Sequence, residues 1–198
     1  MVEYGVAKFV LPGQGESGDH HVVCFNKTRI LIAAIDGIGH GEEAANVSKT
    51  AAALLRSFID EPIISLVKQC HEKLRTTRGV VLSLAFIEPE HGMMTWLGIG
   101  NVQGVLKRCD TKNGSAPESL LLRAGVVGSQ LPALQATVLP IAQGDTLFFA
   151  TDGVRSDFSM TLSARENPQR AADRILEQYR SGTDDALVLV ARLMGIGP

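Results

Sequence analysis

The chain alternates between short apolar runs and turn-forming residues for most of its length. Ten runs have the length of a β-strand, and several are bounded by Gly, Asn, Asp or Pro. In chain order they read GVAKFVL, HHVVCF, RILIAAI, GVVLSLAFI, MMTWLGI, VQGVLKR, SLLLR, ATVLPI, DTLFFAT and ALVLVARL. Short polar links, Asn26-Lys27-Thr28 and His91-Gly92, join two pairs of runs as hairpins. The pattern therefore predicts many antiparallel strands.

Two regions follow a helical pattern instead. An Ala/Leu-rich segment runs from Glu42 to about Arg75 and is interrupted at Pro62, which predicts two consecutive helices. Near the C-terminus, Asn167 can cap a third helix that has Pro168 at its first position. Antiparallel strands with two groups of helices inserted between them predict an α+β sandwich, in which helices cover sheets.

Length and charge narrow the classes of function. The 198 residues suffice for one domain with a sizeable core and are short for two, so we expect a single domain over 1–198. The 19 Lys and Arg against 21 Asp and Glu give a formal net charge of −2. Nucleic acid or an anionic membrane surface would favour a basic face. We therefore expect neither as a partner.

No segment carries the marks of secretion or membrane insertion. The N-terminus lacks a basic stretch followed by a long apolar run, so no signal peptide is predicted. The uncharged segment 124–144 contains two prolines and three glutamines, which favours a loop and a strand over a membrane span. Cys24, Cys70 and Cys109 are odd in number and widely spaced, which favours reduced thiols in the cytoplasm. No long amphipathic helix is left over, so we expect a monomer.

Acidic residues recur where an apolar run meets a turn. LIAAIDG and FFATDG both end in an Asp-Gly pair, at Asp36 and Asp152, although Asp-Gly by itself is a common turn dipeptide. Asp19 closes a glycine-rich loop, and Asp184-Asp185 leads directly into ALVLV. If the strands share one sandwich, these positions can converge, and packed carboxylates raise each other's pKa unless cations neutralise them. Oxygen-only ligands of this kind favour Mg²⁺ or Mn²⁺ over zinc.

The run Gly37-Ile38-Gly39-His40-Gly41 leads from the first Asp-Gly pair into the first predicted helix. A glycine carbonyl can approach a cation closely, so Gly37 fits an oxygen-only site. The rival interpretation is a phosphate-binding loop at a helix N-terminus. The Walker lysine of such loops is missing here, which weighs against this alternative.

Four motifs occur in order along the chain: SGD, LIAAIDGIGHG, FFATDGV and GTDDALVLV. Together they resemble the bacterial metal-dependent serine/threonine phosphatases of type 2C, in the branch that serves sporulation and stress responses. The resemblance covers Gly18 to Val190. We expect no attached sensory or membrane domain, and in this the chain looks most like the feedback phosphatases of the stressosome.

The resemblance implies an αββα sandwich of two antiparallel sheets flanked by helices, with two Mn²⁺ or Mg²⁺ ions at one end of the sheets. Carried over by position, Asp36 would bridge both metals and Gly37 would offer its carbonyl to one of them. Asp152 and Asp184 would complete the second metal site, and Asp19 would act mainly through metal-bound water. The activated water would hydrolyse phosphoserine or phosphothreonine without a covalent intermediate. The implied substrates are phosphorylated STAS-domain scaffold or antagonist proteins of a stressosome.

The chain departs from the family pattern at two places. Type 2C enzymes of the eukaryotic kind have a phosphate-binding Arg where this chain has Gln14, and a His where it has Ile38. His40 stands two residues later and is a candidate general acid, with a role at the start of the helix as its alternative. Asp185 neighbours the expected ligand Asp184, and a slip of one residue would exchange their roles.

Two other functions remain open on the residues alone. A module that binds phosphorylated partners without hydrolysing them would have the same fold, but it would lack at least one metal ligand. A histidine-kinase-like ATP-binding domain has a glycine box that resembles Asp36-Gly37-Ile38-Gly39. That box needs glycine two residues after the Asp, where this chain has Ile38.

Overall fold

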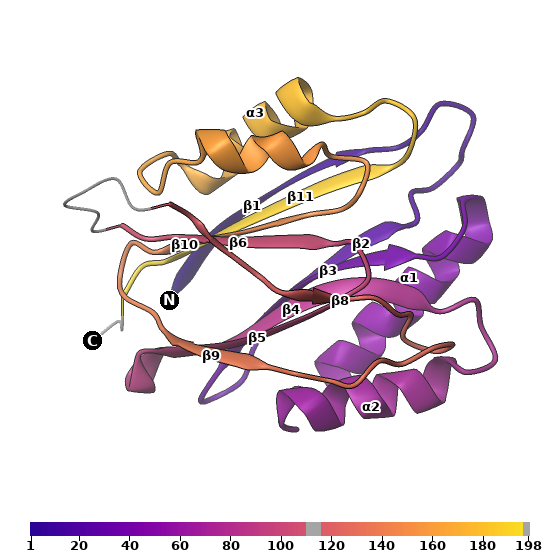
Figure 1. Ribbon diagram of the computed structural model, residues 1–198, viewed down its shortest axis with the longest axis horizontal. Helices are drawn as coiled ribbons and strands as arrows, with labels where there is room; N and C mark the ends of the chain where they lie inside the picture. Colours follow the sequence, from indigo (N-terminus) through magenta and orange to yellow (C-terminus); the bar gives the residue numbers. More distant parts are fainter. Residues whose placement is uncertain (110–115, 196–198) are drawn as a thin grey trace.

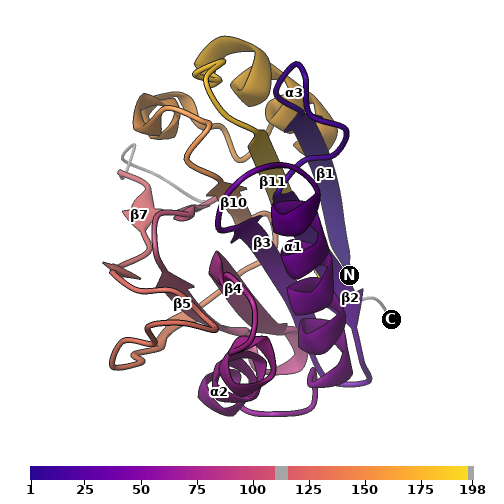
Figure 2. The same ribbon diagram turned by 90° about the vertical axis from the view of Figure 1, so that its right-hand side faces the viewer.

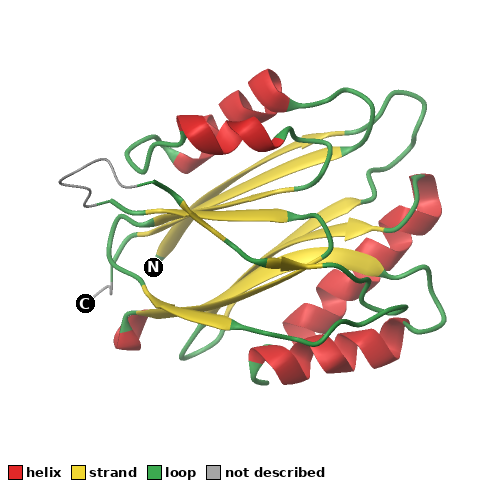
Figure 3. Ribbon diagram, in the orientation of Figure 1, coloured by secondary structure: helices red, strands yellow, loops and turns green. Residues whose placement is uncertain are grey.

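The computed structural model describes residues 1–109 and 116–195. Two β-sheets are stacked face to face, and helices cover the outer face of each (Figure 1). Coloured by secondary structure, the yellow sheets lie between red helices above and below (Figure 3). The predicted αββα sandwich is therefore confirmed.

The first sheet is antiparallel throughout and joins the two ends of the described chain. Its N-terminal strand is an edge strand and pairs with the last strand of the chain. Across the sheet the order is β1 (Val2–Phe9), β11 (Ala186–Leu193), β10 (Thr146–Ala150), β6 (Gln103–Lys107) and β7 (Glu118–Ser119).

The second sheet is built mainly from consecutive hairpins. Its order is β2 (Asp19–Phe25), β3 (Ile30–Gly37), β4 (Val80–Glu88), β5 (Met93–Ile99) and β8 (Leu122–Arg123), with β9 (Thr137–Pro140) also on β5. The short β5–β8 pair is parallel, whereas the other pairs of this sheet are antiparallel. The run SLLLR, expected as one strand, is divided between β7 and β8, so it passes from one sheet to the other.

The helices lie where the sequence predicts them. α1 (Gly41–Ser57) and α2 (Ile63–Leu74) cover the second sheet, and α3 (Pro168–Tyr179) covers the first. In the view turned by 90°, α3 lies on one side of the sheets and α1 and α2 on the other (Figure 2). Two 3₁₀ turns complete the regular structure, η1 (Pro89–His91) and η2 (Ser156–Thr161).

Three apolar layers hold the sandwich together. One lies between α1, α2 and the second sheet, one between the sheets, and one between the first sheet and α3. In β3, Leu31, Ala33 and Ile35 face the helices, whereas Ile32 and Ala34 face the other sheet. Because side chains alternate along a strand, a strand that is buried on both faces must be apolar at every position. This explains the unbroken run LIAAI before Asp36.

No helix in the described part of the chain is long and apolar enough to cross a membrane. The three cysteines are unpaired, as predicted: Cys70 is buried, Cys24 is partly buried and Cys109 is exposed.

The cap of α3 offers a test of the fold. The Asn167 side chain accepts hydrogen bonds from the backbone N–H groups of Gln169, at 3.1 Å, and Arg170, at 3.2 Å. We expect Asn167→Ala to lower the free energy of unfolding by about 1 kcal/mol, because these two N–H groups lose their partner. Chemical denaturation measures this change. Asn167→Ser should keep most of the stability, and the exposed Glu177→Ala on the same helix serves as control; equal stability of Asn167→Ala and wild type would contradict the prediction.

Candidate metal centre

Strand register brings the first two predicted carboxylates together. Asp19 begins β2 and lies directly opposite Asp36 near the end of β3. Asp36 shares its strand face with Ile32 and Ala34, which pack between the sheets, so its carboxylate is directed toward the first sheet. Both carboxylates therefore lie at one end of the layer between the sheets.

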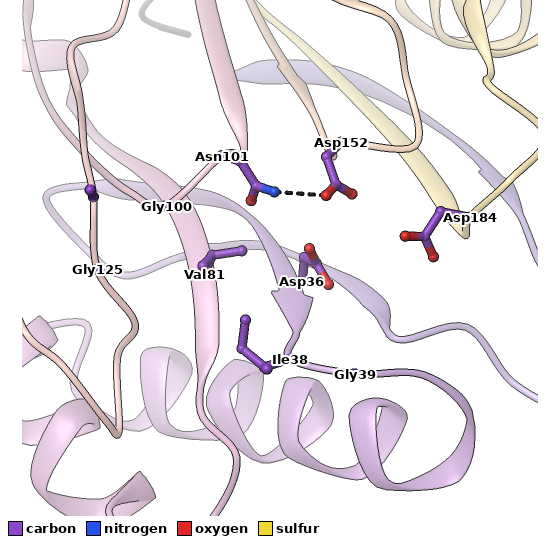
Figure 4. A pocket seen from close by; sticks show the side chains of 10 residues that line it. Asp36, Ile38, Gly39, Val81, Gly100, Asn101, Gly125, Asp152 and Asp184 are labelled. Atoms are coloured by element: carbon purple, nitrogen blue, oxygen red, sulfur yellow. Dashed lines mark hydrogen bonds between the residues drawn. The ribbon is translucent and has the colours of Figure 1, made fainter.

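The first sheet supplies two more carboxylates at the same end. Asp152 follows β10 and Asp184 precedes β11, and these neighbouring strands are antiparallel. The end of β10 and the start of β11 therefore lie side by side. Asp36, Asp152 and Asp184 face a common pocket of about 420 Å³ from three separate elements (Figure 4). The remaining lining residues are Ile38, Gly39, Val81, Gly100, Asn101, Ala124 and Gly125.

Asp19 lies behind this pocket and is only 3% exposed. Its carboxylate accepts a hydrogen bond of 2.7 Å from the Thr151 hydroxyl, which in turn accepts one of 2.8 Å from the Leu187 N–H. Thr151 precedes Asp152, so one short segment fixes both a buried and a pocket-lining carboxylate. The action of Asp19 through metal-bound water stays a prediction.

Burial and mutual repulsion disturb the ionisation of these groups. Desolvation, together with the charges of Asp19, Asp152 and Asp184, raises the pKa of Asp36 to about 8. Desolvation also raises the pKa of Asp19 to about 7, against the lowering effect of the Thr151 hydrogen bond. The pKa of Asp152 is raised by burial and by Asp184. Protons or cations are therefore needed to stabilise this end of the sandwich.

The adjacent residues Asp184 and Asp185 have different surroundings. Asp184 is exposed and lines the pocket. Asp185 is 6% exposed, and its two oxygens accept hydrogen bonds from the N–H groups of Leu11, at 2.8 Å, and Gly18, at 2.7 Å. Asp185 thereby holds the loop before Asp19, whereas the Asp184 carboxylate lines the pocket and accepts a hydrogen bond of 2.8 Å from the Asp185 N–H.

The glycines of the two Asp-Gly pairs allow close packing of the backbone. Neither Gly37 nor Gly153 has a positive φ. A Cβ on Gly37 would lie 2.2 Å from the carbonyl oxygen of Ala44 in α1, and one on Gly153 would lie 1.9 Å from that of Asp185. The turn interpretation is therefore wrong for Asp36-Gly37, which lies within β3, and is confirmed for Asp152-Gly153, where the Val154 N–H donates a hydrogen bond of 3.0 Å to the Thr151 carbonyl. Gly37 does not line the pocket, and the coordination of a metal by its carbonyl stays a prediction.

His40 does not join the carboxylates. It is exposed, does not line the pocket, and its side chain makes no capping hydrogen bond to α1. Glycines with φ of +107° and +71° flank it at positions 39 and 41, and they direct the chain out of the pocket and into the helix. The geometry therefore gives no support to His40 as general acid. Gln14, at the position of the family's arginine, accepts a hydrogen bond of 3.1 Å from the Gly41 N–H instead.

Asn101 is a site residue that sequence reasoning did not single out. Its amide donates a hydrogen bond of 2.7 Å to the Asp152 carboxylate (Figure 4). It follows Gly100, whose φ of +89° makes the tight turn between β5 and β6. A polar residue directly after a strand and a glycine is a weak signal, and its pairing with Asp152 is visible only in the fold.

The donor set fits hard divalent cations. Side-chain carboxylates and an amide surround the pocket, and oxygen is the donor that Mg²⁺ and Mn²⁺ prefer. Within residues 1–109 and 116–195, no three His, Cys, Asp or Glu side chains come together closely enough to form a metal site by themselves.

The chain is similar in sequence to known proteins along most of its length. The family model of stage II sporulation protein E (SpoIIE) matches residues 26–194. The phosphoserine phosphatase RsbX of Bacillus subtilis strain 168 is 20% identical over 182 residues, which cover 91% of this chain and 89% of RsbX.

Two solved structures extend the similarity to the fold. One structure comes from work on the bacterial stressosome, described as a modular system adapted to control secondary messenger signalling. It has a TM-score of 0.87 at 26% identity, and the match covers 97% of this chain and 100% of that one. RsbX in complex with magnesium has a TM-score of 0.84 at 20% identity, with 97% of this chain and 95% of that one covered. The similarity thus spans nearly the whole sandwich.

The raised pKa of Asp36 predicts a pH-dependent stability of the metal-free protein. Because the folded pKa is about 8 and the unfolded value is about 4, the folded state holds the proton longer, and stability falls as pH rises between these values. Asp36→Asn removes this titration. In EDTA, the difference in unfolding temperature between Asp36→Asn and wild type should therefore increase in favour of the variant from pH 6 to pH 8. Above pH 8 the difference should stay constant. Thermal unfolding across this range measures it, and an advantage independent of pH would contradict the prediction.

The division of roles between Asp184 and Asp185 predicts opposite phenotypes. Asp184→Asn should weaken Mn²⁺ binding by about tenfold or more, since a pocket carboxylate is lost, and leave stability in EDTA largely unchanged. Asp185→Asn should lower the free energy of unfolding by about 1–3 kcal/mol through its two hydrogen bonds to the loop backbone. Titration calorimetry and denaturation separate the two effects. Exchanged phenotypes would assign the ligand to Asp185.

Proposed function

The chain belongs to the stage II sporulation protein E family of type 2C serine/threonine phosphatases, and we propose that it hydrolyses phosphoserine and phosphothreonine in proteins with two Mg²⁺ or Mn²⁺ ions. One observation carries the proposal. Asp36, Asp152 and Asp184, each next to the end of a different strand, face one pocket, and Asp19 backs it. The 420 Å³ of this pocket leave room for cations, water and a phosphoryl group.

The chain's own residues divide the work of holding the ions. Asp36 would serve both ions, the Gly37 carbonyl would serve one of them, and Asp152 and Asp184 would hold the other. When bound, the two ions supply Lewis acidity that activates water and offsets the charge of the phosphate. Asn101 fixes the orientation of the Asp152 carboxylate through its hydrogen bond of 2.7 Å.

Asp19 is the most buried carboxylate of the group at this end of the sandwich. The Thr151 hydroxyl occupies one of its carboxylate oxygens, and the Lys8 ammonium donates to its backbone carbonyl at 3.1 Å. A carboxylate held in this way can accept a hydrogen bond from a water in the pocket and orient it toward phosphorus. We therefore propose that Asp19 positions water rather than binding an ion directly.

The substrate proposal comes from the relatives. RsbX is named a phosphoserine phosphatase, and the structure of highest TM-score given above comes from work on the stressosome. We propose that this chain acts as a single phosphatase domain, monomeric and cytoplasmic, on phosphorylated STAS-domain proteins of a stressosome. Because the fold is that of type 2C phosphatases, the ATP-binding interpretation of the glycine run has no structural support.

Metal-dependent turnover is the direct test. A phosphoserine peptide should release phosphate in Mn²⁺, and EDTA should abolish the release. Asp36→Asn should lower kcat by about 100-fold or more, because it removes the ligand assigned to both ions. Asp157→Asn, an exposed carboxylate in η2 beyond the pocket, is the matched control and should retain activity.

Two results would contradict the proposed function. Turnover that is indifferent to EDTA and to Asp36→Asn would exclude the metal mechanism. Tight binding of the phosphoprotein without turnover in saturating Mn²⁺ would identify a phosphoprotein-binding module instead.

A further inference from the structure

The pocket contains no cationic side chain of its own. The residues that line it, all within the described ranges, are acidic, amide-bearing or without charge. A phosphate ester carries nearly two negative charges near neutral pH, and bound cations need not satisfy every phosphoryl oxygen. A protein cation at the rim of the pocket would therefore add to substrate binding. The inference below rests on the proposed function and names this cation.

Several basic residues near the site are already engaged. The Lys8 ammonium donates to the Asp19 carbonyl behind the pocket. The Arg123 guanidinium donates to the Gln135 side chain. The Arg155 guanidinium lies 5.3 Å from the centre of the Tyr179 ring and donates to a backbone carbonyl of α3. Each would have to leave the partner named here to reach a phosphate.

Arg78 has a different position, on the loop between α2 and β4. Thr77 orders this loop: its hydroxyl donates to the Leu74 carbonyl at 2.7 Å and accepts from the Gly79 N–H at 3.1 Å. The Gly79 carbonyl accepts a hydrogen bond of 3.1 Å from the Ile38 N–H. The backbone next to Arg78 is therefore tied directly to the segment that follows Asp36.

The Arg78 side chain lies across Gly39, which lines the pocket. A Cβ on Gly39 would lie 2.8 Å from a terminal nitrogen of the guanidinium. Gly39 also has a φ of +107°, a conformation that a residue with a side chain rarely adopts. The glycine thus leaves the space that the guanidinium occupies beside a residue that lines the pocket.

The partner of Arg78 in the structure is easily replaced. Its guanidinium pairs with the Glu43 carboxylate in the first turn of α1, and the two side chains are 56% and 70% exposed. Exposed pairs of this kind contribute about 0–1 kcal/mol. A phosphate offers the same planar guanidinium two acceptor oxygens and more charge. Arg78 and Glu43 also line a second hollow of about 440 Å³, beside the turn of Thr76 and Thr77.

We propose that Arg78 binds the phosphoryl group of the substrate at the rim of the pocket and exchanges the Glu43 carboxylate for phosphoryl oxygens. Gln14 does not supply this contact, because its amide is neutral and its oxygen accepts from the Gly41 N–H. Arg78 binds substrate in this role and transfers no proton.

Steady-state kinetics and product inhibition test the proposal in Mn²⁺-loaded protein. Arg78→Ala should raise KM for a phosphoserine peptide and for p-nitrophenyl phosphate, and Ki for inorganic phosphate, by about tenfold with a smaller change in kcat. Arg78→Lys should restore part of the affinity. Glu43→Gln should lower KM, since it frees the guanidinium. The control is Arg75→Ala, another exposed arginine at the end of α2 that pairs with Glu72, and it should change none of these constants.

The outcomes separate this inference from the proposed function. Wild-type turnover in Mn²⁺ with KM and Ki unchanged in Arg78→Ala would overturn the role of Arg78 and leave the phosphatase intact. A loss of Mn²⁺ affinity in Arg78→Ala would show that the residue supports the Asp36 segment instead, and would also overturn it. If wild type lacks turnover, the proposed function fails. The binding of inorganic phosphate to Mn²⁺-loaded protein, measured by calorimetry, then tests whether Arg78 contributes to phosphate binding. Equal affinity of wild type and Arg78→Ala would overturn the role of Arg78.

Discussion

The structure depends on one electrostatic constraint: carboxylates from both sheets are held together at one end of the sandwich. Asp19 and Asp36 cannot separate, because they face each other in the register of β2 and β3. Asp152 and Asp184 cannot separate from them without moving the paired strands β10 and β11. Apolar layers on both faces of each sheet fix those strands. The repulsion is therefore relieved by bound protons or cations and not by movement.

Neutral polar groups keep this cluster in place without cancelling its charge. The Thr151 hydroxyl and the Asn101 amide each donate to one carboxylate. Asp185 uses both of its oxygens on backbone N–H groups of the loop before Asp19, so it adds rigidity rather than another ligand. A hydrogen bond from a neutral group restricts a carboxylate and leaves its negative charge available. The site is thus ordered in advance and still favours cations.

Sequence patterns predicted the parts of the fold that are encoded locally. Doubly buried strands, three helices and acidic strand ends follow from periodicity, caps and turns, and the ordered motifs assigned the sandwich. Contacts between distant segments could not be predicted in this way. Asn101 meets Asp152, 51 residues away, only because β6 pairs with β10. His40 was expected at the site, but the backbone at its two flanking glycines leads it outward. The loop-holding role of Asp185 likewise depends on a contact 167 residues back along the chain.

Three glycines allow the close contacts around the acidic pocket. Gly37 allows the backbone of α1 to approach the end of β3, and Gly153 allows the start of β11 to approach the residues after β10. Each glycine follows an aspartate of the pocket, so close packing and ligand placement are coupled at both Asp-Gly pairs. Gly39 has a third use, because it leaves room for the Arg78 guanidinium at the rim. The segment Asp36–Gly39 therefore connects the pocket carboxylate of Asp36, the helix α1 that packs behind it, and the Arg78 guanidinium that we propose binds phosphate.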